Sequence, residues 1–357
     1  MIEEIRSVGP ISTARFMELA LGHPTLGYYA RRDPLGAGGD FITAPEVSQV
    51  FGELLGLWFA QAWEQQGQPD PCLLVELGPG RGTLMADLLR AAAQVPDFRA
   101  SLQIHLVETS APLRARQRAR LAGEAIHWHR TFDQVPAGPL LLVANEFFDA
   151  LPVHQMVRTE QGWVERRVEL AGPALGFALS DQPAARTRPL PADQPLGQIT
   201  EVSPMRNAIA RAIGGRLAAD GGVALLVDYG AWSDVTGDTL QAVRDHAPCG
   251  VLETPGEADL SSHVDFRALA LAACEGGAAV YGPVPQGPFL RVMGIDLRVA
   301  RLLERATPGQ RRELRAGLFR LTDGGAMGEL FKILALTRPG TPPPPGFAAP
   351  TLSPETP

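Results

Sequence analysis

Cysteine, lysine and long apolar runs are scarce in this chain of 357 residues. Its three cysteines (Cys72, Cys249 and Cys274) are far apart and form no C-x-x-C pair, so a disulfide framework or a zinc knuckle is not expected. No uncharged apolar stretch approaches about 18 residues, and we therefore expect no membrane span. Lys332 is the single lysine among 32 basic residues, a skew typical of GC-rich coding DNA, and this indicates a bacterial cytoplasmic protein.

Other absences narrow the function further. The net charge of −7 predicts no nucleic-acid partner. The acidic first residues resemble neither a secretory signal nor a basic transit peptide. His127 and His129 share one face of a predicted strand, but no third ligand is evident nearby, so no metal is expected. Without a G-x-S-x-G motif, there is also no starting point for Ser-His-Asp catalysis.

The most informative stretch runs from Leu73 to Leu84, where an apolar strand pattern ends in an acid, a glycine-spaced turn and a helix start. This arrangement binds a nucleotide-type cofactor at the carboxyl end of the first strand of an open α/β sheet. The spacing is E-x-G-x-G-x-G, which is neither the dinucleotide fingerprint nor a phosphate-binding P-loop. It is the first motif of class I S-adenosylmethionine (SAM) methyltransferases, in which a helix N-terminus faces the carboxylate of the ligand. The predicted cofactor-binding residues of the motif are Glu76, Gly78, Gly80, Gly82 and Thr83.

Strand and helix patterns alternate after residue 72, which predicts right-handed crossovers, a mostly parallel sheet and helices on both of its faces. A short helix over 9–22, capped by Ser12, precedes this core, and 278–293 reads as a closing pair of strands followed by helices to about 320. Alternating patterns on both sides of Glu160-Gln-Gly162 predict an inserted antiparallel hairpin, and the Pro-rich stretch 171–197 an irregular segment.

Acids at strand ends are the next candidates. Glu108 ends the second predicted strand, where a carboxylate can accept hydrogen bonds from both ribose hydroxyls; a solvated strand-end acid is the alternative. Thr109 is grouped with it as a cofactor-binding candidate. Asp133, after the third strand, is placed near the adenine amine, with a cap or turn role as the alternative.

The segment Ala144–Pro152 follows the fourth strand, so its side chains face the methyl donor. Asn145 is expected to bind cofactor and to accept hydrogen bonds from an acceptor nitrogen, beside an aromatic wall of Phe147 or Phe148. Glu146 and Asp149 are three positions apart and share a face if the segment is helical. Two carboxylates there could hold a guanidinium by bidentate hydrogen bonds. The alternative is that Asp149 caps a helix and Glu146 is solvated.

Upstream, Thr43-Ala-Pro-Glu46 fits a capping box that opens a long helix. Capping competes with a site role for Glu46, which we predict to close over the methyl with Thr43. The preceding Gly38–Thr43 segment is a candidate lid. Asp228-Tyr-Gly230 ends a later strand and could line the same cleft, or Tyr229 could be structural.

Together these motifs resemble the MidA-like methyltransferases, whose mitochondrial members assist assembly of respiratory complex I. Further matching segments lie at Gly39–Gln49, Ala258–Phe266, Gln286–Leu290 and Met327–Phe331, so that the resemblance spans roughly residues 7–335. It implies a class I SAM-methyltransferase (Rossmann-like) fold, SAM as donor and protein arginine methylation. The partner it implies is a protein substrate, such as an NADH dehydrogenase subunit. Whether the chain also pairs with a second copy in a homodimer is left open by the sequence.

The expected organisation has a split core. The predicted ranges are 1–66 as an N-terminal helical lid, 67–152 and 198–293 as the methyltransferase core, 153–197 as the hairpin and irregular insertion, 294–338 as C-terminal helices packing on the core, and 339–357 as a disordered Pro-rich tail. Three other functions stay open: a SAM-binding assembly protein with little catalysis, a methyltransferase for another nitrogen or small molecule, and a nicotinamide-dependent oxidoreductase, which the missing dinucleotide fingerprint argues against.

Overall fold

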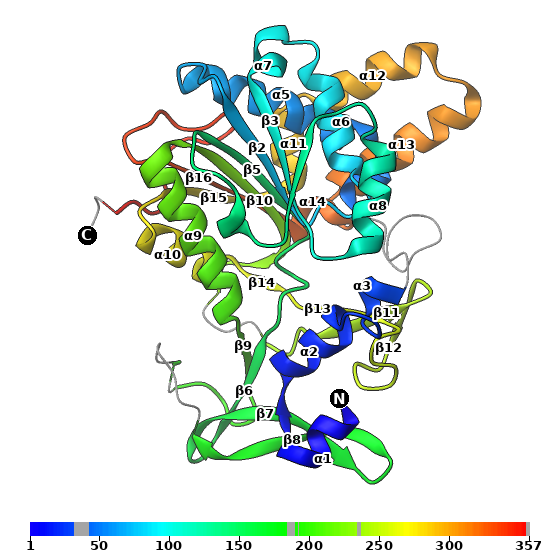
Figure 1. Ribbon diagram of the computed structural model, residues 1–357, viewed down its shortest axis with the longest axis vertical. Coiled ribbons are helices and arrows are strands. Elements are labelled where there is room, and N and C mark those ends of the chain that lie inside the picture. Colours follow the sequence, from blue (N-terminus) through cyan, green and yellow to red (C-terminus); the bar gives the residue numbers. More distant parts are fainter. Residues whose placement is uncertain (32–42, 184–189, 192, 234–236, 355–357) are drawn as a thin grey trace. The chain divides into compact units, whose positions relative to one another are not determined.

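A computed structural model of the chain describes residues 1–31, 43–183, 190–191, 193–233 and 237–354 (Figure 1). The chain divides into two compact units. The first unit comprises Met1–Phe41, Phe148–Ala208 and Ala231–Ala268, and the second comprises Ile42–Phe147, Ile209–Gly230 and Leu269–Pro357. The N-terminal residues thus group with the predicted insertion, and separate folding of the expected domain ranges stays a prediction.

The second unit is built on a sheet with the order β15-β16-β10-β5-β2-β3-β4. Strands β10, β5, β2, β3 and β4 run parallel, and β16 pairs antiparallel with both β10 and β15. The strands are β2 (Cys72–Leu77), β3 (Leu102–Val107), β4 (Ile126–His129), β5 (Leu140–Asn145), β10 (Gly222–Ala231), β15 (Ala279–Pro285) and β16 (Phe331–Thr337). Every residue of β2 and β5 is buried, as expected for central parallel strands covered on both faces.

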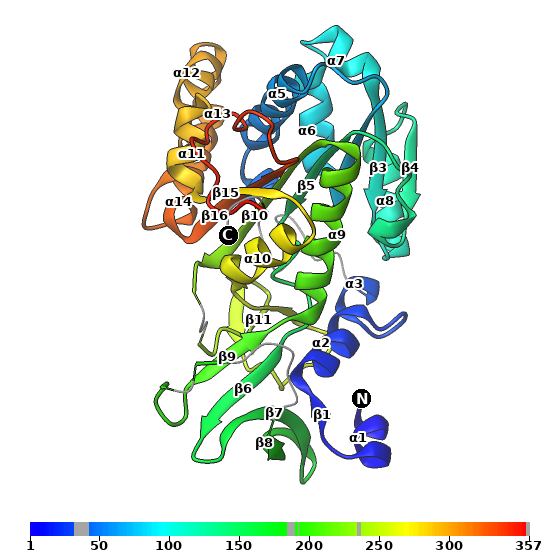
Figure 2. The same cartoon turned by 90° about the vertical axis from the view of Figure 1, so that its left-hand side faces the viewer.

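Helices flank both faces of this sheet, which confirms the predicted α/β class (Figures 1 and 2). They are α4 (Ala44–Val47), α5 (Gln49–Gln65), α6 (Thr83–Ala92), α7 (Pro96–Ser101), α8 (Ala111–Arg120), the 3-10 turn η1 (Phe132–Gln134), α9 (Pro204–Asp220), α10 (Phe266–Glu275), α11 (Gln286–Val292), α12 (Ile295–Arg305), α13 (Pro308–Thr322) and α14 (Met327–Leu330). Helices α9 and α10 begin within the first unit. None of the described helices is both long and apolar enough to cross a membrane.

Two expectations for the C-terminal region are wrong. Residues 278–293 do not form a pair of strands: β15 is followed by helix α11, and its partner β16 comes only after α14. The described part of the tail, residues 339–354, contacts the core and is not disordered. Trp58 Nε1 donates to the Pro345 carbonyl at 2.8 Å, and Phe347 packs on the core. Leu352 bridges to Val280 on β15. A buried N–H donor and the open edge of a sheet both need hydrogen-bond partners, and residues of the tail provide them.

The first unit contains a mostly antiparallel region. Its sheet has the order β1-β7-β6-β9 with β8 also on β7, and a smaller sheet has the order β12-β11-β13. The elements of this unit are α1 (Ile2–Val8), β1 (Ile11–Ser12), α2 (Thr13–Gly22), α3 (Tyr28–Arg31), β6 (His154–Thr159), β7 (Gly162–Ala171), β8 (Ala174–Pro183), β9 (Ile199–Val202), β11 (Gln241–Arg244), β12 (Ala247–Cys249), β13 (Asp259–Ser261) and β14 (Val264–Asp265). Ser12 caps α2 as predicted, since its Oγ accepts from Arg15 N at 3.0 Å.

The predicted hairpin is confirmed as β6 and β7, in antiparallel register from Gln155–Arg166 to Thr159–Gly162. The expectation of an irregular segment is wrong for 174–183, because β8 pairs with β7 along this stretch. Leu175, Phe177 and Leu179 alternate as expected for a strand. The Gly and Ala residues between them have low strand propensity, which makes the pattern weak in the sequence.

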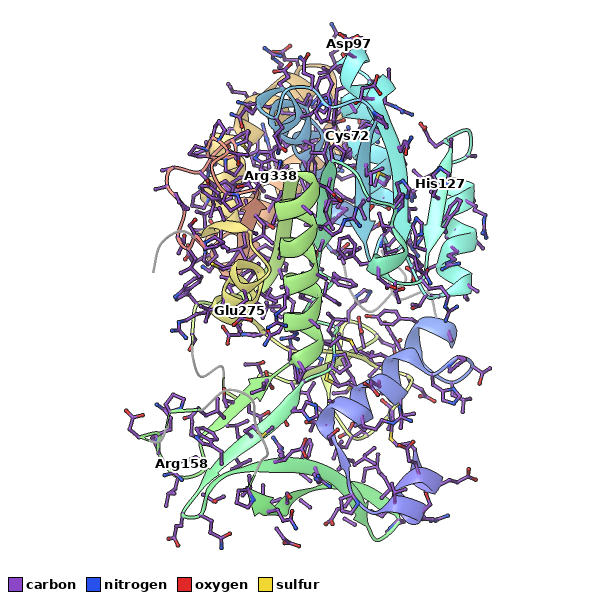
Figure 3. All side chains as sticks on the ribbon, turned by 60° about the vertical axis from the view of Figure 1, so that its left-hand side comes forward. Cys72, Asp97, His127, Arg158, Glu275 and Arg338 are labelled. Atoms are coloured by element: carbon purple, nitrogen blue, oxygen red, sulfur yellow. The ribbon has the colours of Figure 1, made fainter. Side chains whose placement is uncertain are left out.

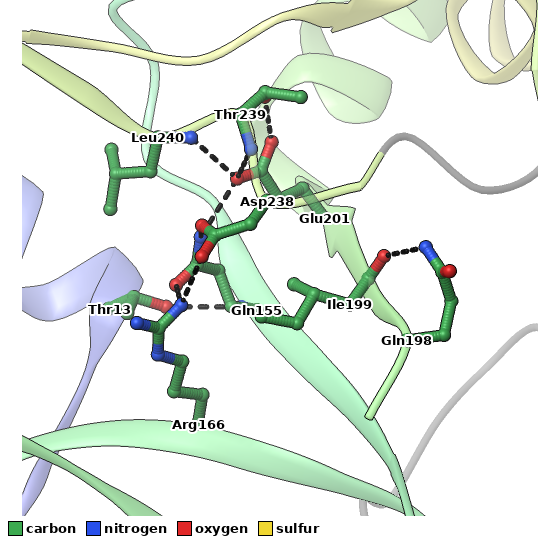
Figure 4. A network of polar contacts seen from close by, with 9 residues as sticks. All are labelled: Thr13, Gln155, Arg166, Gln198, Ile199, Glu201, Asp238, Thr239 and Leu240. Carbon is green, nitrogen blue, oxygen red and sulfur yellow. Dashed lines mark hydrogen bonds and ion pairs between the residues drawn. The ribbon is translucent and has the colours of Figure 1, made fainter. Parts of the chain in front are cut away.

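A buried carboxylate organises the polar interior of this unit (Figure 4). Glu201 Oε1 accepts from the backbone N–H groups of Thr239 and Leu240, at 3.1 and 3.0 Å, and from Gln155 Nε2 at 2.9 Å. Its other oxygen accepts from the Thr239 hydroxyl. Asp238 extends the network through an ion pair with Arg166 at 2.8 Å.

Candidate functional site

The glycine turn after β2 has the conformation that the motif predicts. Gly78, Gly80 and Gly82 have φ angles of +65°, +51° and +78°, in the left-handed region that disfavours side chains. A Cβ at Gly78 would lie 2.8 Å from Phe147 Cδ2, so this position also needs glycine for space. The turn leads into helix α6, which starts at Thr83. The backbone here is therefore shaped for close approach of a ligand.

Glu76 is the last residue but one of β2, before this turn, and its side chain is buried. The residue is 3% exposed, and its Oε2 has no hydrogen-bond partner among the residues that the structure describes. Burial, with a smaller contribution from the Glu108 carboxylate, raises the pKa of Glu76 to about 8. Burying a carboxyl oxygen without a hydrogen-bond partner lowers the stability of the fold, unless a bound ligand provides the partner. A cationic or hydroxyl-bearing ligand would do so.

Glu108 follows β3, the neighbour of β2 in the sheet. Its Oε1 accepts from Ser110 N at 2.8 Å, and its Oε2 is 3.3 Å from Gln117 Nε2. Burial raises the pKa of Glu108. These contacts hold the carboxylate beside the glycine turn, where it was expected.

Gln117 is a site residue that sequence reasoning missed. It is fully buried on α8, and its Nε2 donates to the Gly80 carbonyl at 2.8 Å. Its Oε1 accepts from Trp128 Nε1 at 2.9 Å. Gln117 thus connects the glycine turn with Glu108. The signal available was a polar residue between Leu113 and Leu121 on the apolar face of a predicted helix.

Asn145 and Glu146 lie at the end of β5, next to β2 in the sheet. Glu146 Oε1 accepts from Asn145 Nδ2 at 3.1 Å and from Ala44 N at 2.8 Å. Asn145 Oδ1 is buried without a hydrogen-bond partner in the described part of the chain. These two residues and the segment after Thr43 therefore meet at the edge where Glu76 and the glycine turn lie.

The expected helical arrangement of Glu146 and Asp149 is wrong. Glu146 has a φ of +48°, and no helix forms over 146–149. A residue with a left-handed backbone conformation cannot continue a strand, and β5 therefore ends at Asn145. Asp149 belongs to the first unit, where its Oδ1 accepts from Ala150 N at 2.8 Å and its carbonyl accepts from Arg206 Nη2 at 3.0 Å. Phe148 also belongs to that unit, whereas Phe147 lies against Gly78 in the second.

The competition over Glu46 is decided against capping. Thr43 makes no side-chain cap, and the long helix α5 is capped by Ser48 instead, whose Oγ accepts from Val50 N at 3.3 Å. Glu46 Oε1 accepts from the Thr83 hydroxyl, at the start of α6. The capping-box prediction is therefore wrong, and the Glu46 carboxylate faces the glycine turn. The candidate lid at 38–42 lies outside the described residues.

The other predicted site residues are Thr109, Asp133, Asp228 and Tyr229. Thr109 and Asp133 are exposed to solvent, Asp133 within η1. Asp228 is buried at the end of β10, where its Oδ1 accepts from Tyr229 N at 2.9 Å. The Tyr229 ring packs against Phe331, 5.4 Å between centroids, in the apolar core. This contact favours the structural interpretation of Tyr229.

The histidines of the sheet edge pair with one another. His105 Nδ1 and His129 Nε2 are 2.8 Å apart, and the His105 ring stacks on His127, which lies on the edge strand β4 (Figure 3). Burial lowers the pKa of His105 to about 4. Within the described ranges, no group of three or more His, Cys, Asp or Glu side chains is arranged to hold a metal ion.

The residues present fit SAM. A glycine turn without side chains, a buried acid with an unused oxygen and a second acid held at the next strand match a ligand that has both positive charge and ribose hydroxyls. In this site Glu76, Gly78, Gly80 and Glu108 would hold the ligand. Asn145 and Glu146 lie at the neighbouring strand end.

Comparisons with known proteins agree with this geometry. Residues 54–284 match the family model of S-adenosyl-L-methionine-dependent methyltransferases. The zebrafish (Danio rerio) and human mitochondrial protein arginine methyltransferases NDUFAF7 are each 38% identical to the chain; both alignments cover 94% of it, and 85% and 82% of the relatives. A crystal structure of a protein from Burkholderia thailandensis bound to S-adenosyl-homocysteine matches with a TM-score of 0.84 and 30% identity. That match covers 97% of this chain and 92% of the other.

Proposed function

The chain belongs to the MidA-like family of SAM-dependent methyltransferases, and from that premise we propose that it methylates an arginine side-chain nitrogen of a partner protein. The relatives named protein arginine methyltransferases align with 94% of this chain. We propose a subunit of respiratory NADH dehydrogenase as the partner, on the family resemblance, and the bacterial cytoplasm as the place, on the lysine-poor composition.

The observation that carries the proposal is the pair of carboxylates next to the cofactor residues. Glu146 is held by Ala44 N and Asn145 Nδ2, and Glu46 is held by the Thr83 hydroxyl. Two oriented carboxylates match the planar fork of a guanidinium better than they match a single ammonium or a neutral amine.

When bound, SAM supplies a methyl group on a positively charged sulfur. The protein's own part is alignment and exclusion of water, because transfer to a nitrogen needs little acid chemistry. Glu146 and Glu46 would orient the guanidinium and stabilise its charge, and Asn145 Oδ1 would accept from one of its N–H groups. Asp149, predicted for the same role, stays a prediction, since it belongs to the first unit.

Glu146→Gln tests this assignment. The change should leave SAM affinity within about threefold and reduce turnover by about 100-fold, because it removes a charge-assisted partner of the acceptor. The measurements are calorimetric SAM binding and mass-spectrometric mapping of methylated residues on purified NADH dehydrogenase subunits. Glu304→Gln, on the exposed side of α12, is the matched control and should behave like the parent protein.

Two outcomes would contradict the assignment. Equal losses of SAM binding and turnover would make Glu146 a cofactor or structural residue, and full activity would move the acceptor pocket toward Asp228. Methyl groups found on residues other than arginine would overturn the proposed substrate class and leave the methyltransferase assignment intact.

A further inference from the structure

Strand β8 forms an open edge of the antiparallel sheet in the first unit, where it lies along β7 (Figure 1). Its register with β7 is regular from Ala174 to Leu179 and shifts between Leu179 and Pro183. Within the described ranges no other strand pairs with β8. The outward N–H and C=O groups of the regular stretch are therefore available to a further strand.

This edge lacks the features that usually prevent pairing between molecules. Residues 174–180, ALGFALS, contain no charged residue and no proline. Lysine or proline on an edge strand normally blocks the addition of a strand from another chain. An uncharged and regular edge is instead suited to such an addition.

The apolar face of β8 is incompletely covered. Phe177 pairs with Val168, which is fully buried, so Leu175, Phe177 and Leu179 lie on the core-facing side of the sheet. Leu175 packs on the apolar cluster of the first unit. Phe177 and Leu179, however, are 37% and 49% exposed, although the Arg166 guanidinium lies 3.5 Å from the Phe177 ring centroid. Adjacent exposed apolar side chains beside an open edge indicate an interaction surface.

We propose that β8 pairs antiparallel with β8 of a second copy of the chain, around a two-fold axis at Phe177. Residues opposite one another in a sheet lie on the same face, so a two-fold axis must pair one residue with its own copy. With Phe177 at the axis, Leu175 lies opposite Leu179 of the second copy, on both sides of the axis. Each apolar side chain of the edge then meets another apolar side chain.

The charges of β7 favour this axis. Glu169 pairs with Gly176, and Arg167 pairs with Ala178. Gly176 would lie opposite Ala178 of the second copy, which places Glu169 and Arg167 of the second copy in one row. Their backbones would be three strand spacings apart, about 14 Å, and the small residues between them leave room for the long side chains. Because Arg167 also contacts Glu165, this attraction contributes to the register more than to the affinity.

Other registers match less well. An axis at Ala178 would place Arg167 in one row with its own copy, and like charges in one row destabilise pairing. An axis at Leu179 would place Phe177 opposite the charged Asp181. The pattern Leu-Gly-Phe-Ala-Leu is symmetric about Phe177, so the axis at this residue alone matches apolar with apolar and small with small on both sides.

A second copy suits this edge better than an unrelated extended segment does. A two-fold pair uses the same edge of both copies and leaves no edge open, so the assembly closes at two chains. The paired stretch is short compared with a standard interface of about 1,600 Å². We therefore expect a reversible dimer with a dissociation constant in the micromolar range.

Sedimentation equilibrium of the full chain tests the inference. Over about 1–200 μM, the parent should show a reversible equilibrium between monomer and dimer. Leu179→Lys should raise the dissociation constant of the dimer at least about tenfold, because it puts a charge into the apolar edge. Leu196→Lys makes the same change at an exposed leucine of the first unit outside β8, and this matched control should stay within about twofold of the parent.

Charge reversal tests the position of the axis. Glu169→Arg should weaken the dimer about threefold to tenfold at low salt, and less at about 0.5 M salt, because it puts two arginines into each row. The double variant R167E/E169R restores opposite charges in each row and should recover dimerisation at low salt. Circular dichroism and calorimetric SAM binding verify that each variant is folded.

Three outcomes would contradict the inference. A parent that stays monomeric over the whole concentration range would overturn it. A dimer that Leu179→Lys leaves unchanged would also overturn it, because another surface would then hold the two copies together. A double variant that dimerises no better than Glu169→Arg would overturn the axis at Phe177. These measurements need no methyl acceptor, so the proposed arginine methylation is tested separately.

Discussion

Two buried glutamates, one in each unit, differ in a way that separates structure from function. Glu201 in the first unit is 6% exposed and accepts hydrogen bonds from Gln155, Thr239 and Leu240 (Figure 4). Glu76 in the second is 3% exposed, and its Oε2 has no hydrogen-bond partner among the residues described.

Hydrogen bonding distinguishes a buried acid that stabilises the fold from one that binds a ligand. A carboxylate whose oxygens are satisfied by its own chain stabilises the fold, because its desolvation is offset by hydrogen bonds. A carboxylate left with an unused oxygen destabilises the fold until something binds it. We therefore interpret Glu201 as a structural residue and Glu76 as a cofactor-binding residue.

The largest effect is expected from Glu201→Ala. Removing the carboxylate leaves two backbone N–H groups and the Gln155 amide without their acceptor, at a cost of about 3–5 kcal/mol in the free energy of unfolding. Urea unfolding followed by circular dichroism measures this. Glu201→Gln keeps one acceptor oxygen and should lose less. A loss below about 1 kcal/mol for the alanine variant would break the comparison.

Deletion of residues 340–357 comes next. The tail supplies the acceptor for Trp58 Nε1 and the ring of Phe347, which packs near Phe289 with 5.6 Å between centroids. We expect a loss of about 2–4 kcal/mol in stability with SAM affinity unchanged. Removal of 353–357 alone is the control. An unchanged melting temperature for the longer deletion would show that these contacts do not stabilise the unit.

Glu76→Gln should act in the opposite sense. SAM affinity should fall by about 2–3 kcal/mol, because the site loses one carboxyl oxygen as a partner of the ligand, while the stability of the ligand-free protein is kept or raised. Calorimetry and thermal melting without ligand measure the two quantities. A variant that melts much lower than the parent would place Glu76 with Glu201 as a structural acid.

The pH dependence of the melting temperature is a further test of the difference between Glu76 and Glu201. With a folded pKa of about 8 and an ordinary value of 4.5, Glu76 keeps its proton in the folded state over this window. Its stabilising contribution is complete below the ordinary value and is lost as pH rises through about 8. The melting temperature of the ligand-free parent should therefore fall between about pH 5 and about pH 9 more steeply than that of Glu76→Gln. Equal pH slopes of the melting temperature for the two proteins would contradict the raised pKa of Glu76.

The smallest effect is expected at Glu108, which shares its hydrogen bonds between protein and ligand. Glu108→Ala should weaken SAM by about 1–3 kcal/mol, and Glu108→Gln by about 1 kcal/mol, since the amide keeps one acceptor. Glu304→Gln serves again as the exposed control. If both Glu108 variants bind SAM like the parent, the ribose is held elsewhere.

Much of the fold could be predicted because its signals are local. The strand–turn–helix at Glu76 to Thr83 and the acid at Glu108 follow from consecutive residues and strand period. The misplaced elements have non-local causes. Strand β16 pairs with β15 across four intervening helices, and the tail is ordered by Trp58, nearly 290 positions away. No window of sequence contains both partners of such a contact.

The same division applies to the site. Sequence proposed Asn145, Glu146 and Glu46 as neighbours of the cofactor, but their hydrogen bonds came from Ala44 and Thr83, and the helix expected at 146–149 gave way to a left-handed Glu146. Gln117 was missed because its partners, Gly80 and Trp128, are distant in the chain.

The alternation of strands and helices in the parallel core, the glycine turn and the acids at the strand ends could be predicted from the sequence, because spacing along the chain sets each of them. Which buried carboxylate has hydrogen-bond partners for its oxygens depends on contacts that form only in the folded chain. Glu76 and Glu201 look alike as residues in apolar strands, and their difference lies in donors that folding brings from elsewhere in the chain.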